Sequence, residues 1–355
     1  MSITSNPLPG VPAVESPLFE KIFAANEMAA QTLDVARKLQ TEGFAVIEFP
    51  DPNFDKLASE IIRKLDSRYD WQGWRCGTIP NLRVQDAWRD VTEVKEIACN
   101  PKVLKLLSDL YGRPAFAFQT LNFPVGTQQH FHSDSVHFSS HPERFMAGVW
   151  VALEDIDSDN GPLVYYPGSH KLPVFTNEHI GTNPDWSAQN PYEHYSRYER
   201  AWEEIVHSLD LKPLHFKAKK GQALIWSANL LHGGGAQRDL NRTRHSQVTH
   251  YYFHGCCYYT PLGSVPFLGP IQFREIIDIS TGKLVPNVLN GKEVSKTHLD
   301  YTNPRAHVEI PKPTRLPDDF DRKGYLKANP DVEAAKMDPA RHWMEFGYRE
   351  GRRWR

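Results

Sequence analysis

Residues 145–153 read FMAGVWVAL, a short apolar run of aromatic and β-branched side chains that is typical of a buried β-strand. Similar runs lie on both sides of it along the chain, and clusters of Gly, Pro, Asn and Asp separate them. These runs cover residues 115–123, 163–166, 223–227 and 246–254. Short strands at regular intervals predict a β-sandwich or a β-barrel.

The region before these strands has helical spacing instead. The expected helices cover residues 18–39, 55–65 and 94–111, and they enclose one expected strand at 44–49. Gly43 is placed to end the first helix, and Pro101 can restart the last one after a break at Asn100. Helices followed by strands predict an α+β fold with a β core.

The composition excludes several classes of protein. The 355 residues carry 41 Lys and Arg against 43 Asp and Glu, a formal net charge of -2, so we expect no binding to nucleic acid. No stretch approaches the roughly 20 apolar residues of a membrane span, and the start has no signal-type segment. We therefore expect a soluble, cytoplasmic protein. Its four cysteines form no CxxC pattern and are expected to be reduced thiols.

The chain divides into unequal parts. Residues 1–16 are rich in proline and serine and are expected to be a flexible leader. Residues 17–310 form the main domain, and a polar, aromatic-rich insert at 175–211 is either a surface cover or an active-site lid. A proline-rich linker at 311–324 leads to a small helical unit at 325–355.

One group of side chains has the spacing of metal ligands. His132 and Asp134 lie two positions apart, so on an extended strand both side chains leave the same face and can close on one ion. A third imidazole would complete a two-histidine, one-carboxylate set, which binds one face of Fe(II) and leaves three positions open. The best candidate is His232, where an apolar strand runs into the glycine turn 233–235.

An arginine follows the third histidine. Arg244 opens the strand expected at 247–253. An arginine that faces the inside of a barrel is an unpaired buried charge unless it binds a carboxylate, for which its planar fork is suited. The order of HxD, distal histidine and arginine therefore favours an iron site with a carboxylate-bearing co-substrate.

At these positions the chain resembles the phytanoyl-CoA dioxygenase family of Fe(II)/2-oxoglutarate oxygenases. The resemblance is carried by the strand at 145–155, the turn DNGPL at 159–163 and PGSH at 167–170, and it extends from about residue 39 to residue 253. It implies a double-stranded β-helix (a jelly roll or cupin-like barrel) with the N-terminal helices packed on one sheet. It also implies that Fe(II), 2-oxoglutarate and O2 are used to hydroxylate a small-molecule metabolite, with release of succinate and CO2.

The resemblance assigns roles to individual residues. The iron ligands that it implies are His132, Asp134 and His232. The co-substrate contacts that it implies are Arg244, Ser246, Trp150 and Asn122. Of these, Arg244 pairs with the distal carboxylate of 2-oxoglutarate. The chain departs from the family at Gly234, where many members have a serine that helps to hold the co-substrate.

Substrate contacts are expected from two segments. In this family the stretch that here contains Arg83, Gln85, Trp88 and Arg89 often faces the site, and ordinary loop positions are the alternative. The insert offers Tyr and Trp side chains that could cover a substrate. The carboxylate of Asp134 argues against halogenation, because related halogenases have a small residue in its place.

Alternatives remain open at two levels. The C-terminal unit reads YLKANPDV at 325–332 and resembles a short module found beside bacterial glycosyltransferases, so it is either a protein-docking unit or a plain helical cap. The whole chain could instead be a cupin-like sugar isomerase or epimerase, which would have no need of Arg244. It could also be a non-catalytic jelly-roll binding protein, which the intact metal set disfavours.

Overall fold

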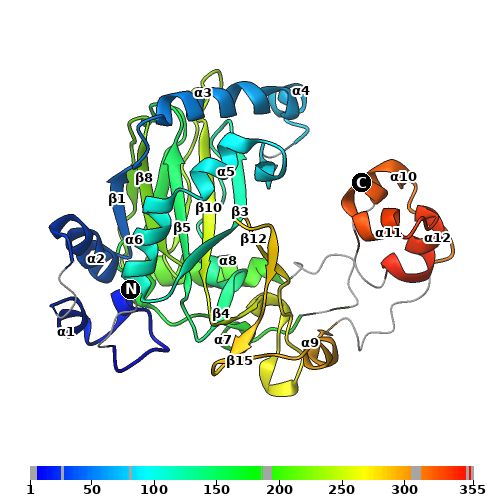
Figure 1. The fold of residues 1–355 in the computed structure, drawn as a ribbon. Helices are drawn as coiled ribbons and strands as arrows, with labels where there is room; N and C mark the ends of the chain where they lie inside the picture. The colour runs from blue at the N-terminus through cyan, green and yellow to red at the C-terminus, as the bar shows by residue number, and fades with distance from the viewer. Residues whose placement is uncertain are drawn as a thin grey trace.

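The computed structural model describes residues 6–24, 28–79, 82–184, 186, 194–304, 313–348 and 352. Parts of the predicted leader, insert, linker and C-terminal unit therefore lie outside the described residues. The fold is α+β with an antiparallel jelly-roll core, as predicted (Figure 1).

The larger sheet of the jelly roll has six antiparallel strands in the order β1-β8-β5-β10-β3-β2. These are β1 (Phe44–Glu48), β8 (Gln222–Ser227), β5 (Met146–Ala152), β10 (Ser246–Phe253), β3 (Ala115–Phe123) and β2 (Val84–Gln85). The central strand β5 pairs with β8 and β10, so that Trp150 lies opposite both Leu224 and Val248. This strand order brings residues from distant parts of the chain onto one face.

The second sheet is smaller and consists of β7 (Leu214–Phe216), β6 (Leu163–Tyr165) and β9 (His232–Gly234), in that order. An isolated bridge joins His132 to His232 at its edge. Apolar side chains from both sheets, Trp150 and Phe216 among them, pack together in one buried cluster. Burial of this apolar surface holds the two sheets face to face.

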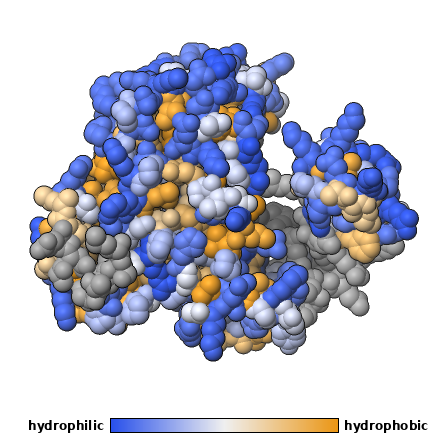
Figure 2. Space-filling view, viewed as in Figure 1, coloured by the Kyte–Doolittle hydropathy of each residue, from blue (hydrophilic) through white to orange (hydrophobic). Residues whose placement is uncertain are grey.

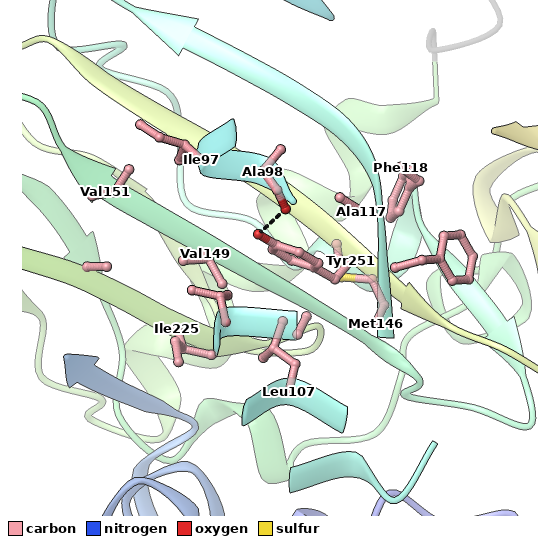
Figure 3. Close-up of a cluster of buried hydrophobic side chains, with 14 of the residues drawn as sticks. Ile97, Ala98, Leu107, Ala117, Phe118, Met146, Val149, Val151, Ile225 and Tyr251 are labelled. Atoms are coloured by element: carbon pink, nitrogen blue, oxygen red, sulfur yellow. Dashed lines mark hydrogen bonds between the residues drawn. The ribbon is translucent and has the colours of Figure 1, made fainter. Parts of the chain in front are cut away.

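Helices cover the other face of the larger sheet (Figure 1). They include α2 (Ala30–Glu42), α3 (Phe54–Leu65), α5 (Thr92–Ala98) and α6 (Pro101–Tyr111). Figure 3 shows Ile97, Ala98 and Leu107 packed against strand residues such as Val149, Ile225 and Tyr251. The Tyr251 hydroxyl donates a 2.9 Å hydrogen bond to the carbonyl oxygen of Ala98, which ties β10 to α5.

The helix boundaries follow the predicted signals with one correction. The single helix expected at 18–39 is two helices, α1 (Phe19–Ala24) and α2. Gly43 ends α2 in the left-handed conformation, with φ of 86°. Asn100 caps α6 by accepting hydrogen bonds from the backbone N–H groups of Lys102 and Val103 at 3.0 and 3.2 Å. A further short helix, α4, spans Trp71–Arg75.

The insert contains α7 (Asn177–Ile180) and α8 (Tyr195–Ser208). Tyr198 and Trp202 of α8 are buried in an apolar cluster with Tyr166, which follows β6. The aromatic residues of α8 therefore anchor the insert beside the smaller sheet.

Small two-stranded sheets, whose strands except β4 all follow β10 in the chain, also form, and the sequence pattern did not predict them. They are β4 (Ser139–His141) with β11 (Cys257–Tyr259), β12 (Ile276–Asp278) with β13 (Lys283–Val285), and β14 (Val288–Leu289) with β15 (Lys292–Glu293), and α9 (Lys296–Thr302) follows. The segment between β11 and β12 carries Arg274, which reaches the cavity described below.

The predicted small helical appendage is present. It consists of α10 (Arg322–Ala328), α11 (Pro330–Ala334) and α12 (Pro339–His342), around a core of Tyr325, Val332 and Trp343. Hydrophilic side chains cover most of its visible surface in Figure 2. Within the described ranges, none of the helices combines the length and apolar character that a membrane crossing requires.

Candidate active site

A cavity of about 530 Å³ lies inside the jelly roll. Its lining comes from β3, β5, β9 and β10, from the loop that holds the HxD pattern, from α8 and from the segment after β11. Of the residues predicted for the site, the lining includes His132, Asp134, Trp150, His232 and Arg244. The strand order of the larger sheet therefore brings together side chains that are more than 100 positions apart in the chain.

The three predicted metal ligands converge at the base of this cavity. Their ligand atoms all lie within 4.8 Å of one another. The Nε2 atoms of His132 and His232 lie 3.6 and 3.7 Å from the Oδ1 and Oδ2 atoms of Asp134, respectively. Reciprocal backbone hydrogen bonds of 2.9 and 3.0 Å between His132 and His232 fix the separation of the two imidazoles.

Backbone carbonyl groups orient both imidazoles. His132 Nδ1 donates to the carbonyl oxygen of His130 at 3.0 Å, and His232 Nδ1 donates to that of Leu230 at 3.0 Å. A carbonyl oxygen can only accept, so Nδ1 carries the proton and Nε2 presents a lone pair toward Asp134. This is the tautomer that binds a metal through Nε2.

The surroundings of the triad also set its charges. Burial lowers the pKa of His232 to about 4, so this imidazole is neutral at neutral pH. Burial alone would raise the pKa of Asp134, but the neighbouring imidazoles, His232 foremost, outweigh it and hold that pKa well below its usual range. For His132, burial opposes and Asp134 favours the charged form, and the net effect raises the pKa. An ionised carboxylate between imidazoles is a donor set suited to a divalent transition metal.

A fourth imidazole stands beside the triad. His250 on β10 is buried, and its Nε2 lies 3.8 Å from Asp134 Oδ2. Its Nδ1 lies 3.0 Å from Oε1 of Gln119 on β3. His250 was not among the residues predicted for the site. The alternation of side chains along a strand could have indicated it, because His250 lies four positions after Ser246 and therefore on the same face of β10.

The predicted co-substrate arginine is almost completely buried. Arg244 is 1% exposed, and burial lowers its pKa to about 10, so it stays charged at neutral pH. Its Nε donates to the carbonyl oxygen of Gly161 at 2.9 Å, and its Nη1 donates to Ser246 Oγ at 2.9 Å. Across the ranges that the structure describes, Arg244 forms no ion pair with a carboxylate.

The indole of Trp150 places an unsatisfied donor beside the unpaired charge of Arg244. Its Nε1 is buried without a hydrogen-bond partner in the described part of the chain, and the Arg244 guanidinium lies 5.7 Å from its ring centroid. Buried donors without acceptors are costly unless a ligand satisfies them. An anionic acceptor bound between Arg244 and Trp150 would remove both penalties.

Asn122 is not at the cavity. Its neighbours Leu121 and Phe123 line the cavity, whereas the Asn122 amide donates to Gln247 Oε1 at 3.2 Å on the opposite face of the sheet. Gln247 in turn donates to the carbonyl oxygen of Val94 in α5 at 3.0 Å. Alternation along β3 therefore directs Asn122 toward the helices and away from a co-substrate.

The departure at Gly234 has a steric explanation. A Cβ atom at Gly234 would lie 2.5 Å from Thr127 Oγ1 and 2.7 Å from the backbone nitrogen of Gln128. Thr127 itself lines the cavity. The hydroxyl of Thr127 thus occupies the space that a side chain at position 234 would need.

The segments expected to contact substrate reach the cavity only in part. Arg83, Gln85 and, from the insert, Tyr195 line it. Trp88 instead donates to Asp86 Oδ1 at 3.2 Å, and the Arg89 guanidinium lies over the Trp88 ring at 4.6 Å.

Comparison with known proteins agrees with this geometry. Residues 39–246, more than half of the chain, match the family model for phytanoyl-CoA dioxygenase (PhyH). The chain belongs to the phytanoyl-CoA dioxygenase family. The resemblance noted from the sequence is confirmed, and with it the prediction of a dioxygenase.

Individual members of the family share only about a quarter of their aligned residues with this chain. A probable phytanoyl-CoA dioxygenase of Caenorhabditis elegans is 25% identical over 253 residues, which cover 64% of this chain and 75% of the relative. The peroxisomal phytanoyl-CoA dioxygenase of Rattus norvegicus is 26% identical, over 58% of this chain and 59% of its own length. The alignments thus span about three fifths to three quarters of these relatives.

A solved structure has the same fold. The non-heme alpha-ketoglutarate-dependent epimerase SnoN from nogalamycin biosynthesis aligns with a TM-score of 0.50 at 17% identity, over 76% of this chain and 97% of SnoN. At this identity the likeness supports the jelly-roll fold alone.

Proposed function

We propose that the protein is an Fe(II)/2-oxoglutarate-dependent dioxygenase that hydroxylates an unactivated C–H bond of a small-molecule metabolite, with release of succinate and CO2. One observation carries the proposal: the buried set of His132, Asp134 and His232 opens into the same cavity as the unpaired guanidinium of Arg244. A family of dioxygenases built on this fold is consistent with it.

The donor set fits ferrous iron. The two imidazoles, each binding through a deprotonated Nε2, and one carboxylate would hold one face of the ion and leave other positions for co-substrate and oxygen. When bound, iron supplies the activation of O2 that couples decarboxylation of 2-oxoglutarate to oxidation of the substrate. The protein's part is to position the reactants and to exclude water.

Arg244 is the residue that would bind the distal carboxylate of 2-oxoglutarate. Gly161 and Ser246 hold its Nε and Nη1, which fixes the plane of the guanidinium before any ligand arrives. Trp150 Nε1 would donate to the same anion. Such a clamp is preorganised, so little side-chain entropy is lost on binding.

The alternative functions would leave the metal ligands or Arg244 without a role. A sugar isomerase in this barrel would leave Arg244 charged, buried and unpaired, at a cost that nothing in its chemistry offsets. A binding protein would not need three converging ligands, two of them histidines with preset tautomers. Asp134 is present and ionised, which disfavours halogenation because a halide would need its position on the metal.

An anaerobic titration of metal-free protein with Fe(II) and 2-oxoglutarate tests the proposal. We expect the visible charge-transfer absorption of a chelated ferrous complex in the wild type and its loss in His132→Ala. His207→Ala, at an exposed position on α8, is the matched control and should retain the band. A folded, iron-loaded wild type without the band would rule the function out.

We also propose that the main domain ends near residue 310, that the helical unit after it is a docking module, and that the protein is cytoplasmic. The separate core of Tyr325, Val332 and Trp343 supports an independent unit. If it serves docking alone, a chain that stops before residue 313 should release succinate at the wild-type rate. A large loss of that rate would instead assign the unit to the active site.

A further inference from the structure

The cavity contains cationic side chains that neither the metal set nor the co-substrate clamp uses. Arg274 and Arg83 line it together with Arg244, whereas Asp134 is the only carboxylate among its described lining residues. Neither Arg274 nor Arg83 forms an ion pair within the described parts of the chain. An excess of positive charge around a cavity indicates a negatively charged ligand.

Arg274 is held in a defined position. Its Nη1 donates to Thr260 Oγ1 at 3.3 Å, and its guanidinium lies over the ring of Phe138 at 4.8 Å from the centroid. Its backbone N–H donates to the carbonyl oxygen of Tyr258 at 2.8 Å, which fixes the chain at this point to β11. Its Nε is buried and has no hydrogen-bond partner in the described chain. A preset guanidinium with an unused donor is suited to an oxyanion.

Arg274 lies close to the metal set. Its Nη1 is 3.5 Å from the carbonyl oxygen of His137, and the His137 ring centroid is 6.4 Å from that of His132. Burial is the main reason why the pKa of His250 is lowered, and the Arg274 charge adds to that effect. A group bound at Arg274 would therefore sit next to the reacting centre.

The charges of the metal, the co-substrate and their protein ligands balance without Arg274. The two positive charges of Fe(II) and that of Arg244 balance the charge of Asp134 and the two carboxylates of 2-oxoglutarate. Arg274 and Arg83 then remain as uncompensated cations on the substrate side of the cavity. Arg274 also lies outside residues 39–246, so it belongs to a part of this chain that the family match does not cover.

We propose that the substrate carries an oxyanion group, a carboxylate or a phosphate, which Arg274 binds while Arg83 attracts it at the cavity mouth; Thr260, whose hydroxyl donates to the carbonyl oxygen of His137 at 3.2 Å and accepts from Arg274, holds the guanidinium in place. This inference rests on the proposed function, because it assumes that the metal and 2-oxoglutarate occupy the other half of the cavity. An anchored acid group would present a neighbouring C–H bond to the metal in one orientation. Tyr195 of the insert would cover the same substrate.

The test compares small aromatic probes whose head groups differ in charge, with benzamide as the neutral isostere of benzoate. Benzoate, phenyl phosphate and the neutral isostere benzamide are titrated calorimetrically into the anaerobic complex with Fe(II) and 2-oxoglutarate, after its charge-transfer band shows saturation. Saturation with 2-oxoglutarate keeps the anions away from Arg244. We expect wild type to bind benzoate or phenyl phosphate at least tenfold more tightly than benzamide, and the tighter anion identifies the group.

Variants assign the preference to the arginines. Arg274→Gln should reduce the preference to less than twofold, Arg83→Gln should reduce it partially, and Arg274→Lys should keep only part of it, because the charge remains but the planar guanidinium is lost. Arg89→Gln is the control, since Arg89 lies on Trp88 away from the cavity. Arg83 is exposed, so Arg83→Gln remains informative even if Arg274→Gln folds poorly.

The outcomes separate this inference from the proposed function. A wild type that forms the band but prefers the anions less than twofold, or binds no probe, overturns the oxyanion inference alone. A preference that survives unchanged in Arg274→Gln also overturns it. Absence of the band in the wild type overturns the proposed function and this inference together.

Discussion

The indole of Trp226 donates a 2.8 Å hydrogen bond to Oδ2 of Asp134, deep under the candidate metal centre. The room for this indole comes from Gly148 on the neighbouring strand β5, which pairs with Trp226 in register. A Cβ atom at Gly148 would lie only 2.0 Å from the Trp226 ring. A glycine in the middle of a buried strand therefore allows the tryptophan to reach across the sheet and hold the carboxylate.

Replacing Trp226 by Phe removes this donor and keeps most of the packing. Partners that orient a ligand typically contribute 10-fold to 100-fold in metal affinity, so we expect the Fe(II) affinity of Trp226→Phe to fall by about that factor. Anaerobic calorimetry with Fe(II) measures it. Trp71→Phe, which removes a comparable 3.1 Å indole bond to the exposed Asp66, should leave the affinity unchanged. Equal affinities in wild type and Trp226→Phe would refute a positioning role for the indole.

Gly148→Ala should reproduce part of this loss of Fe(II) affinity although neither Trp226 nor Asp134 is substituted. The added methyl group must displace the Trp226 ring, and overpacking of a core typically costs about 1–3 kcal/mol of stability. We expect a lower free energy of unfolding, measured in urea, and weaker Fe(II) binding in the folded variant. Gly168→Ala offers a comparison at a glycine with nothing within 4 Å, where any loss reflects its φ of 82° alone. Unchanged iron binding in Gly148→Ala would show that the indole has another way to reach Asp134.

Arg244→Lys keeps the charge but loses the planar fork. Gly161 and Ser246 each accept from a separate nitrogen of the guanidinium, and one ammonium group cannot reproduce that geometry. We expect the Kd for 2-oxoglutarate, read from the charge-transfer band, to rise about 30-fold or more, the lower end of the cost of disrupting a buried charge pair. Arg242→Lys, at an exposed arginine paired with Asp157, should have the wild-type Kd. A Kd that changes equally in both variants would remove Arg244 from the co-substrate site.

Gly234→Ser restores the residue type that many members of the family have, yet we expect it to be harmful in this chain. The new side chain would meet Thr127 Oγ1 and the backbone of Gln128, and backbone cannot yield as a flexible side chain does. A loss of about 1–3 kcal/mol is expected for such overpacking, visible as a lower Tm. The double variant Thr127→Gly with Gly234→Ser should recover part of it. A single Gly234→Ser variant with wild-type Tm would contradict the steric reading.

The parts of the fold and site that could be predicted depend on local patterns. Asn100 and Pro101 specify a helix start through their own backbone preferences, and the structure has α6 there. His132 and Asp134 were paired by their spacing on an expected strand. In the structure Asp134 instead begins a short 3-10 helix (Asp134–Val136), and the pair still meets His232 across an isolated bridge. Arg244 was assigned to the inside of the barrel, where a buried cation lacks a partner, and it is 1% exposed.

The parts that could not be predicted depend on the register between strands and on contacts between segments that are far apart in the sequence. Asn122 has the right residue type, but the register of β3 against β10 turns it to the helix side, and the strand pattern alone did not fix that register. Arg274 comes from an irregular segment without periodicity, so no pattern connects it with the cavity. Gly234 could be recognised as a departure, but its reason is the approach of residues 127–129 from another part of the chain.

His250 presents the last test, because it decides whether the metal set has three or four members. Its Nε2 lies 3.8 Å from Asp134 Oδ2, nearly as close as that of His232, while its Nδ1 faces Gln119. His250 is not within the group of ligand atoms that lie within 4.8 Å of one another, so we expect it to brace Asp134 rather than to bind the ion. His250→Gln should then bind Fe(II) within about 10-fold of wild type, as for the loss of one orienting contact, and keep the charge-transfer band at a shifted wavelength. His232→Gln removes one of the three proposed metal ligands. In the same measurement this variant should lose the band altogether. Loss of the band in both variants would make His250 a fourth ligand and would leave too few open positions for 2-oxoglutarate and oxygen together.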